Sequence, residues 1–347
     1  MTTPPPARVA VRYALVFLGL LALALLLWRV WYAVLLGFGG VLFGVFLRHL
    51  AHHLHRWTRL PMRGSVVACA VALLALVILA VSVAGAAVAG QLSELGEALT
   101  SGAQRVRGIL SDTAWGRALL DSASQGAQGG GMLLRIPSLM FTVVDALLGL
   151  VIVVFAGLYL AIEPRLYVKG AVRLFPASRQ PRMEDVLHRA GQALWLWLRA
   201  RIVVMVVVAL VTWAGLQLVG VPLAMPLALV AGLLEFIPFF GSILAAVPIL
   251  MVALTVDPMT TLYALFLVLA IQQLEGNVLA PLVEQKAVSL PPALILVAAI
   301  AFLMLFGPLG AVLASPLLVV AMVGTQMLYV EDALGQQVEV IGTEEGK

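Results

Sequence analysis

Residues 235–248, EFIPFFGSILAAVP, decide how this chain is built. The segment lies within apolar sequence long enough for membrane-spanning helices. It nevertheless carries the carboxylate of Glu235, the helix breakers Pro238 and Pro248, and Gly241. Charges and helix breakers are costly at membrane depth, and they persist where backbone or side chain lines a buried or water-filled path. The segment therefore indicates a discontinuous helix of the kind found in transporters.

Composition places the whole chain in a membrane. It has 347 residues, of which 63% are hydrophobic and 11% charged, and its mean hydropathy is +1.08. A soluble domain carries about a quarter charged residues. The apolar runs are long and continuous rather than segments of about ten alternating residues, which favours helices over a β-barrel. We therefore predict an all-α, polytopic helical membrane protein.

Several functional classes are disfavoured by what the sequence contains. The net charge of +4 does not indicate nucleic-acid binding, because the basic residues lie in loops beside spans. Cys69 is the single cysteine, which excludes an intramolecular disulfide and predicts a small core residue. The motifs GxxxxGK[ST], HExxH and GxSxG do not occur, so we expect neither ATP hydrolysis nor another enzymatic activity, and no cofactor.

Changes in composition divide the chain into six parts. They are three N-terminal spans with a basic cytoplasmic loop (1–90), an extracytoplasmic amphipathic segment (91–138), a fourth span (139–162), a basic cytoplasmic helical segment (163–201), a C-terminal transport core (202–330) and a cytoplasmic tail (331–347). We expect a tight turn at Arg29 between the first two spans. Trp195 and Trp197 are predicted to anchor the fifth span at the membrane interface.

The distribution of basic residues predicts the orientation. Arg48–Arg63 and Arg165–Arg201 carry the excess of arginine, so both stretches are expected in the cytoplasm. Gln91–Ser138 balances four acids against four bases and is expected outside. The N-terminus is then expected in the cytoplasm. The high use of alanine, leucine, valine and arginine is typical of a GC-rich bacterial genome, so we expect a multi-pass protein of a bacterial inner membrane.

The length of one uncharged run predicts a further break in the helices. Ile202–Leu234 is uncharged and would form about 50 Å of helix, against a hydrocarbon core of about 30 Å. It must break, and Gly220-Val221-Pro222 is the expected place. Asp257-Pro258 predicts a turn, and Gly307–Gly310 interrupts the last apolar region.

Glu235 is the first candidate site residue. Pro238 removes a backbone donor and is expected to free a carbonyl one turn earlier, while Gly241 permits tight geometry. A carboxylate beside unpaired carbonyls suits a cation, a proton or a polyol. The alternative is that Glu235 ends a helix near the interface and is solvated there.

A second polar cluster comprises Gln272, Gln273, Glu275 and Asn277, and is followed by Pro281. In a helix, Gln272 would share one face with Glu275, three residues later, and Gln273 would share one face with Asn277, four residues later. Two interrupted helices of this kind build the sites of secondary transporters, so we expect Glu235 and Glu275 to face one polar cavity. The alternative is a loop that leaves the membrane.

Four histidines form a weaker candidate. His49, His52, His53 and His55 have helical spacings that suit a metal ion, but no carboxylate or cysteine lies near them in the sequence. A solvated basic stretch at the headgroup level is the preferred interpretation, and we predict no metal site. Asp145 is expected either at the outer interface or paired with Arg135.

Three segments in this order resemble the AI-2E family of bacterial transporters, which are autoinducer-2 exporter-like permeases. They are EFIPFFGSILAAVP (235–248), QQLEGNVLAPLVEQKAVSLPP (272–292) and GPLGAVLASPLL (307–318). The resemblance covers nearly the whole chain. It implies about eight membrane segments with broken or re-entrant helices in the C-terminal half, cytoplasmic termini and a homo-oligomer.

The resemblance also implies a pathway for a solute or an ion. The positions that match the family's motifs are Glu235, Pro238, Gly241, Gln273, Glu275, Asn277 and Pro281. We add Gln272 to the predicted pathway. Ser242 stands where many relatives have proline, and Val283–Lys286 departs from the more basic pattern of the family. These departures leave the substrate open.

The sequence leaves three functions open. The first is export of a small polar, autoinducer-2-like solute by a secondary mechanism that uses no ATP. The second is sodium(lithium)/proton antiport on the same scaffold. The third is a membrane scaffold that transports nothing, which the interrupted helices disfavour because a scaffold gains nothing from them.

Overall fold

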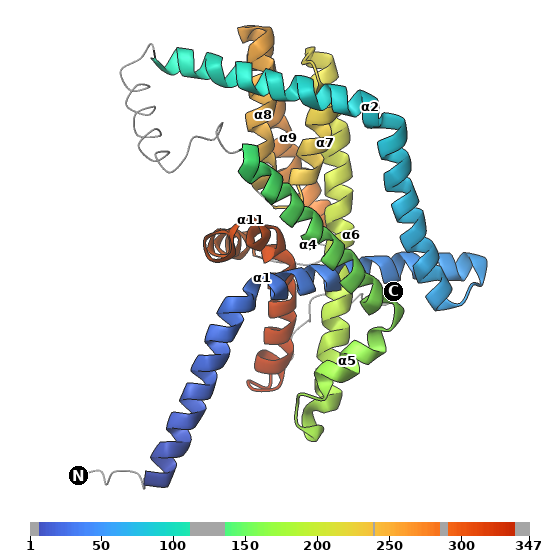
Figure 1. Ribbon diagram of the computed structural model, residues 1–347, viewed down its shortest axis with the longest axis vertical. Coiled ribbons are helices and arrows are strands. Elements are labelled where there is room, and N and C mark those ends of the chain that lie inside the picture. Colours follow the sequence, from blue (N-terminus) through green and yellow to red (C-terminus); the bar gives the residue numbers. More distant parts are fainter. Residues whose placement is uncertain (1–6, 112–135, 239, 285–290, 337–347) are drawn as a thin grey trace.

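The architecture is entirely helical over the residues that the structure describes (Figure 1). The structure is a computed structural model and describes residues 7–111, 136–238, 240–284 and 291–336. Within these ranges no strand occurs, which confirms the predicted all-α class. The elements are α1 (Ala7–Thr58), α2 (Met62–Ser111), α4 (Ile136–Ile162), α5 (Pro164–Val172), η2 (Ala177–Arg179), α6 (Gln180–Val219), α7 (Ala224–Leu234), α8 (Phe240–Val256), α9 (Pro258–Leu274), η3 (Glu275–Glu284), α11 (Pro292–Gly324) and η4 (Thr325–Glu331).

Helices of membrane-spanning length account for much of the chain. Among the described residues four are long and apolar enough to cross a membrane, or five if α4 and α5, which meet at 89°, form one bent span. Three shorter apolar helices, including α7 and α8, add to this set. The protein is therefore a polytopic helical membrane protein, and the count of about eight segments stays a prediction.

The N-terminal region differs from the expected hairpin. α1 is one helix of 52 residues that continues through Arg29 and bends along its course (Figure 1). The turn predicted at Arg29 is wrong, because its neighbours include neither glycine nor proline and a charge alone does not end a helix. Most of the expected basic loop is helical as well, and the chain reverses only at Arg59–Pro61.

The predicted amphipathic helix is present and continues the third apolar stretch without a break. We call its described part, residues 94–111 of α2, the cross-arm, because α2 passes over the ends of α7, α8 and α9 in Figure 1. Leu95 is buried among residues of α6 to α9, and Arg105 donates a hydrogen bond to the carbonyl of Leu254 over 2.6 Å. The glycine-rich segment Ser122–Gly131 lies outside the described residues.

The breaks expected at Gly220, at Asp257-Pro258 and at Gly307 are confirmed. α6 ends at Val219, and Gly220 follows with a φ of 79°, a left-handed conformation that glycine adopts without strain. Asp257 caps α9 by accepting hydrogen bonds from Thr260 and Met259, and these bonds, led by that of the Thr260 hydroxyl, lower the pKa of Asp257. Gly307 kinks α11 with a φ of 68°.

The core is organised along α6. At the end that carries the arginine-rich segment, α6 packs against α1, α5, α11 and η4 through residues such as Ala193, Leu194 and Val319; we call this the basic-end cluster. Towards the cross-arm, Leu216 of α6 packs against α2, α7, α8 and α9 in the cross-arm cluster. A smaller group around Val204 and Val208 connects the two along α6.

A separate close contact joins α1 to α4. A Cβ atom added to Gly157 would lie 2.8 Å from the carbonyl oxygen of Gly40 and 3.0 Å from the nitrogen of Gly44. Neither backbone atom can move aside as a flexible side chain would. Small residues therefore allow these helices to approach closely, as is common between helices in membranes.

Replacing Gly157 by alanine tests this contact. Gly157→Ala is expected to push α1 and α4 apart and to lower the free energy of unfolding by about 1–3 kcal/mol. Gly37→Ala is the matched control, because a Cβ there meets nothing within 4 Å. Thermal unfolding of the purified chain in detergent measures both. Equal stability of the two variants would contradict the proposed packing.

Candidate functional site

A buried ion pair lies at the break between α7 and α8. The Nη2 atom of Arg201 donates a hydrogen bond to Oε1 of Glu235 over 3.1 Å. The two side chains are 1% and 0% exposed. The alternative in which Glu235 is solvated at an interface is therefore wrong for this structure.

The break itself positions the carboxylate. α7 ends at Leu234 and Glu235 is its C-cap, and the chain then reverses into α8. Pro238 cannot donate to the carbonyl of Leu234, but Ile237 does so over 3.0 Å. The Leu234 carbonyl, which was predicted to be unpaired, therefore accepts a hydrogen bond in this structure.

Gly241 brings the start of α8 against the end of α7. A Cβ atom on Gly241 would lie 2.6 Å from Cα and 2.7 Å from the nitrogen of Glu235. No larger residue fits without separating the two half-helices. This contact confirms the tight geometry expected at Gly241.

Arg201 is the residue that sequence reasoning missed. It was counted among the cytoplasmic bases, but its side chain is buried between the basic-end cluster and the group around Val204. An isolated buried charge is very costly, so each of the two groups requires the other. The available signal was that Arg201 directly precedes a long uncharged run that ends at Glu235.

A small cavity adjoins Glu235 on the cross-arm side. Its volume is about 10 Å³, which is room for about one water molecule. Besides Glu235, polar groups in its wall are the hydroxyls of Thr212 and Ser242. The remaining wall is apolar and comes from α6, α7, α8 and α9, including Val208, Ala231, Ala245, Ile249, Val268 and Ile271.

Aromatic side chains close in sequence to each member of the pair pack against each other. The rings of Trp197 and Phe236 meet edge to face at 5.6 Å, within the basic-end cluster. Trp195 stacks on the imidazole of His49 at 4.4 Å. The expected interfacial role is therefore wrong for Trp197, which is buried, and both tryptophans pack against other helices of the chain.

The second polar cluster does not share this cavity. Gln273 and Asn277 are exposed, and the Asn277 amide donates to Oε1 of Gln273 over 2.7 Å, as their spacing predicted. Glu275 is partly exposed and is absent from the cavity wall, so the expected common cavity is not formed in this structure. Residues 275–284 continue α9 as the π-helix η3, and the side chain of Pro281 lies outside the described residues.

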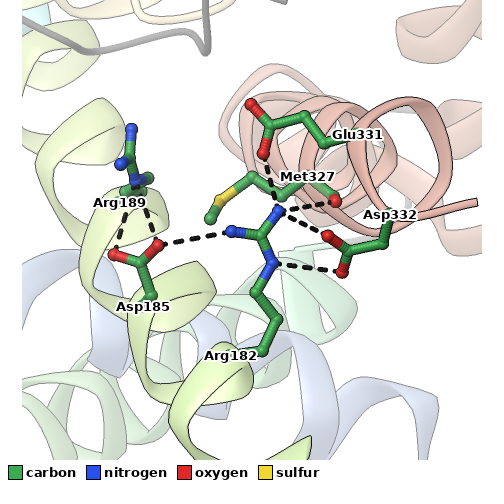
Figure 2. A network of polar contacts seen from close by, with 6 residues as sticks. All are labelled: Arg182, Asp185, Arg189, Met327, Glu331 and Asp332. Atoms are coloured by element: carbon green, nitrogen blue, oxygen red, sulfur yellow. Dashed lines mark hydrogen bonds and ion pairs between the residues drawn. The ribbon is translucent and has the colours of Figure 1, made fainter. Parts of the chain in front are cut away.

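A network of charges lies at the basic end of α6 (Figure 2). The Arg182 guanidinium contacts Glu331 at 2.6 Å and Asp332 at 2.8 Å, and it donates to the carbonyl of Met327 over 2.9 Å. Asp185 lies on its other side at 3.5 Å and also pairs with Arg189 at 3.4 Å. The network ties the start of α6 to the end of η4.

The remaining candidates stay separate from the site. Nδ1 of His49 lies 2.9 Å from the Val45 carbonyl oxygen and donates to it in the tautomer that is protonated at Nδ1. Nδ1 of His53 lies 3.1 Å from the His49 carbonyl oxygen in the same way. Cys69 is buried beside Leu47 and Val66, as predicted for a small core residue. The side chain of Asp145 lies outside the described residues.

Comparison with known sequences identifies one family. The sequence model described as AI-2E family transporter matches residues 14–328. This range includes the helix break, both members of the buried pair and the second polar cluster.

Individual relatives match only about half of the chain, at moderate identity. The chain is 35% identical over 179 residues to "Putative transport protein MT0215" of Mycobacterium tuberculosis, covering 50% of this chain and 48% of that protein. It is 28% identical over 162 residues to "Putative transport protein YrrI" of Bacillus subtilis, covering 47% and 46%. It is 28% identical over 159 residues to "AI-2 transport protein TqsA" of Escherichia coli K12, covering 45% and 44%. The chain spans about half the length of the curated relatives it matches.

Removing one partner of the pair tests its structural role. Arg201→Met leaves the Glu235 carboxylate buried without this guanidinium and is expected to cost about 3–5 kcal/mol of stability. The double variant Arg201→Met/Glu235→Met is expected to recover most of that loss. Arg199→Met, an exposed arginine on the same helix, is the control and should stay within about 0.5 kcal/mol of wild type. Thermal unfolding in detergent measures the stability of all three variants. A double variant whose loss of stability equals the sum of the losses of the two single variants would refute the coupling between Arg201 and Glu235.

Proposed function

This chain belongs to the AI-2E transporter family, and on that premise we propose that it is a secondary transporter working around the Arg201–Glu235 pair. It moves a small polar solute through residues 202–330 without altering the solute chemically. The observation that carries the proposal is the buried pair at a discontinuous helix. A scaffold that transports nothing would gain nothing from such a pair, since apolar residues pack at least as stably.

In the proposed cycle Arg201 acts as a tethered cation. A proton or a metal cation that binds Glu235 competes with the guanidinium for the same carboxylate, because two positive charges so close together repel. Binding therefore favours a conformation in which Arg201 has moved away from Oε1. The ligand therefore binds one conformation more tightly than the other, and any coupled transporter requires such a difference in affinity.

The structure corresponds to a closed state in this scheme. On the basic-end side, the Trp197–Phe236 contact and the Arg182 network lie between Glu235 and the end of the molecule. On the other side the cross-arm cluster packs over the cavity. Opening towards the basic end would separate α6 from α11 and η4, and would break the Arg182 contacts.

We assign the solute to the class of small polar molecules that includes autoinducer-2. The support is the family and the name of one relative, the AI-2 transport protein of Escherichia coli. The hydroxyls of Thr212 and Ser242 beside Glu235 suit a ligand that exchanges hydrogen bonds. Pro238 and Gly241 serve by holding the two half-helices around this ligand.

The second polar cluster is assigned to a different part of the pathway. Gln272, Gln273, Glu275 and Asn277 lie at the junction of α9 and η3, and π-helical turns often mark functional positions. Pro281 follows within the same π-helix, and the solute would pass this junction after leaving the Glu235 cavity. We place the chain in a bacterial inner membrane as a homo-oligomer with cytoplasmic termini, following the arginine distribution and the family.

A sodium(lithium)/proton antiporter is the second candidate, and the size of the cavity favours it. A volume of about 10 Å³ accepts a water-sized ligand but no organic solute. A carboxylate with two hydroxyls supplies the oxygen atoms that a small hard cation prefers. In this version Glu235 binds proton and cation alternately.

Glu235→Gln tests the transporter assignment. The amide keeps the size of the side chain but binds neither proton nor cation, so autoinducer-2 flux in proteoliposomes is expected to fall at least about tenfold. Glu184→Gln, an exposed acid on α6, is the matched control with wild-type flux expected. Normal expression of both variants confirms folding, and wild-type flux in Glu235→Gln would overturn the role.

The two candidates are separated by a pH-sensitive dye enclosed in the same vesicles. An antiporter changes the internal pH when sodium or lithium is added, and Glu235→Gln abolishes this response. Vesicles that show autoinducer-2 flux but no dye response between pH 7 and 9 would remove the antiporter.

A further inference from the structure

An open pocket of about 340 Å³ lies where α1, α2, α4 and α5 meet. Three of its lining residues are arginines from different helices: Arg48 from α1, Arg63 from α2 and Arg165 from α5. Glu163, between α4 and α5, is the one acid among them. Apolar side chains, including those of Ile162 and Leu166, complete the wall.

The charges in this pocket do not balance. Arg63 pairs with Glu163 at 2.7 Å, and both side chains are largely exposed. Arg48 donates a hydrogen bond to the Ala161 carbonyl over 3.0 Å, which satisfies a donor but not the charge. Arg165 lies close enough to Arg48 to repel it, and within the described part of the chain no acid pairs with Arg165. Three arginines and one glutamate leave two positive charges in excess.

The surroundings place the pocket at the headgroup layer of a membrane. α5 leaves α4 at 89°, as a helix does when it turns from the membrane normal into the surface. Leu166, Tyr167 and, just beyond α5, Leu174 are exposed although they are apolar. At the end of α1, Trp57 is 91% exposed. Aromatic and apolar side chains next to arginines are typical of the interface between lipid and water.

An apolar track leads from the pocket along α4. Phe155, Tyr159 and Ile162 follow one another at spacings of four and three residues, so they share one face of the helix. Phe155 and Tyr159 are exposed, and Ile162 lines the pocket. An acyl chain lying on this face would begin at the arginines.

We propose that this pocket binds the phosphate of an anionic phospholipid, with an acyl chain along Phe155 and Tyr159. Guanidinium groups hold phosphate oxygens by paired, charge-assisted hydrogen bonds, and basic pockets between membrane helices recognise anionic headgroups in this way. The bound phosphate neutralises the repulsion between Arg48 and Arg165. It also fixes the angle between α4 and α5, and α5 contacts α6 through Val172 in the basic-end cluster.

The test uses the full-length chain purified in detergent, with mixed micelles of dioleoyl phosphatidylglycerol or dioleoyl phosphatidylcholine. Phosphatidylglycerol is expected to raise the unfolding temperature more, and to remain bound in native mass spectra. Arg165→Gln is expected to weaken phosphatidylglycerol binding about tenfold, and Arg63→Gln/Arg165→Gln further. Arg173→Gln, which removes the same charge just beyond α5 and away from the pocket, is the matched control.

Each outcome decides the proposal. Selective loss of phosphatidylglycerol binding in the Arg165 variants, with wild-type binding in Arg173→Gln, supports it. Equal binding of phosphatidylcholine, or equal loss in Arg173→Gln, overturns it, because the pocket arginines would not be the recognition element. Stabilisation by inorganic phosphate as strong as by the lipid identifies a soluble-anion site and also overturns it. Arg165 is exposed and outside the ion pairs, so its variant folds even where the double variant does not.

Discussion

The Arg201–Glu235 ion pair is the interaction on which the rest of this structure depends. Two charges are withdrawn from water in the middle of a protein whose other core contacts are mainly apolar. The burial cost of each charge is offset by the opposite charge 3.1 Å away. Helix α6 must therefore stay beside the break between α7 and α8. A charge pair of this kind contributes little net stability compared with apolar packing, so its presence argues for a role in function.

Several features of the fold follow from holding that pair in place. α6 is long enough to contact the basic-end cluster with its first half and the cross-arm cluster with its second half. Gly241 lets α8 return against the end of α7, which keeps Glu235 inside the protein. At the basic end the Arg182 network ties α6 to η4 and to Asp332 just beyond it (Figure 2).

Residues that act on the local backbone predicted the structure better than residues whose effect depends on a distant partner. The breaks at Gly220 and Gly241 formed where expected because glycine acts on the local backbone. The interruption expected at Pro281 did not form, and this residue lies in η3, which continues α9. The turn predicted at Arg29 rested on a charge and aromatic neighbours, which helices accommodate, and α1 runs through it. The cavity predicted between Glu235 and Glu275 required two helices to face each other, and helical spacing within one segment carries no information about its partner.

The sequence by itself determined the class of this protein, the backbone breaks at Gly220, Gly241 and Gly307, and its family. Those properties follow from composition, from residues that limit the backbone and from motifs along the chain. Only the tertiary structure decided which charge accompanies Glu235, which hydroxyls line its cavity and which arginines gather between α1, α2, α4 and α5. The physical reason is that these groups are distant in sequence, and the packing of helices through their apolar faces brings them together.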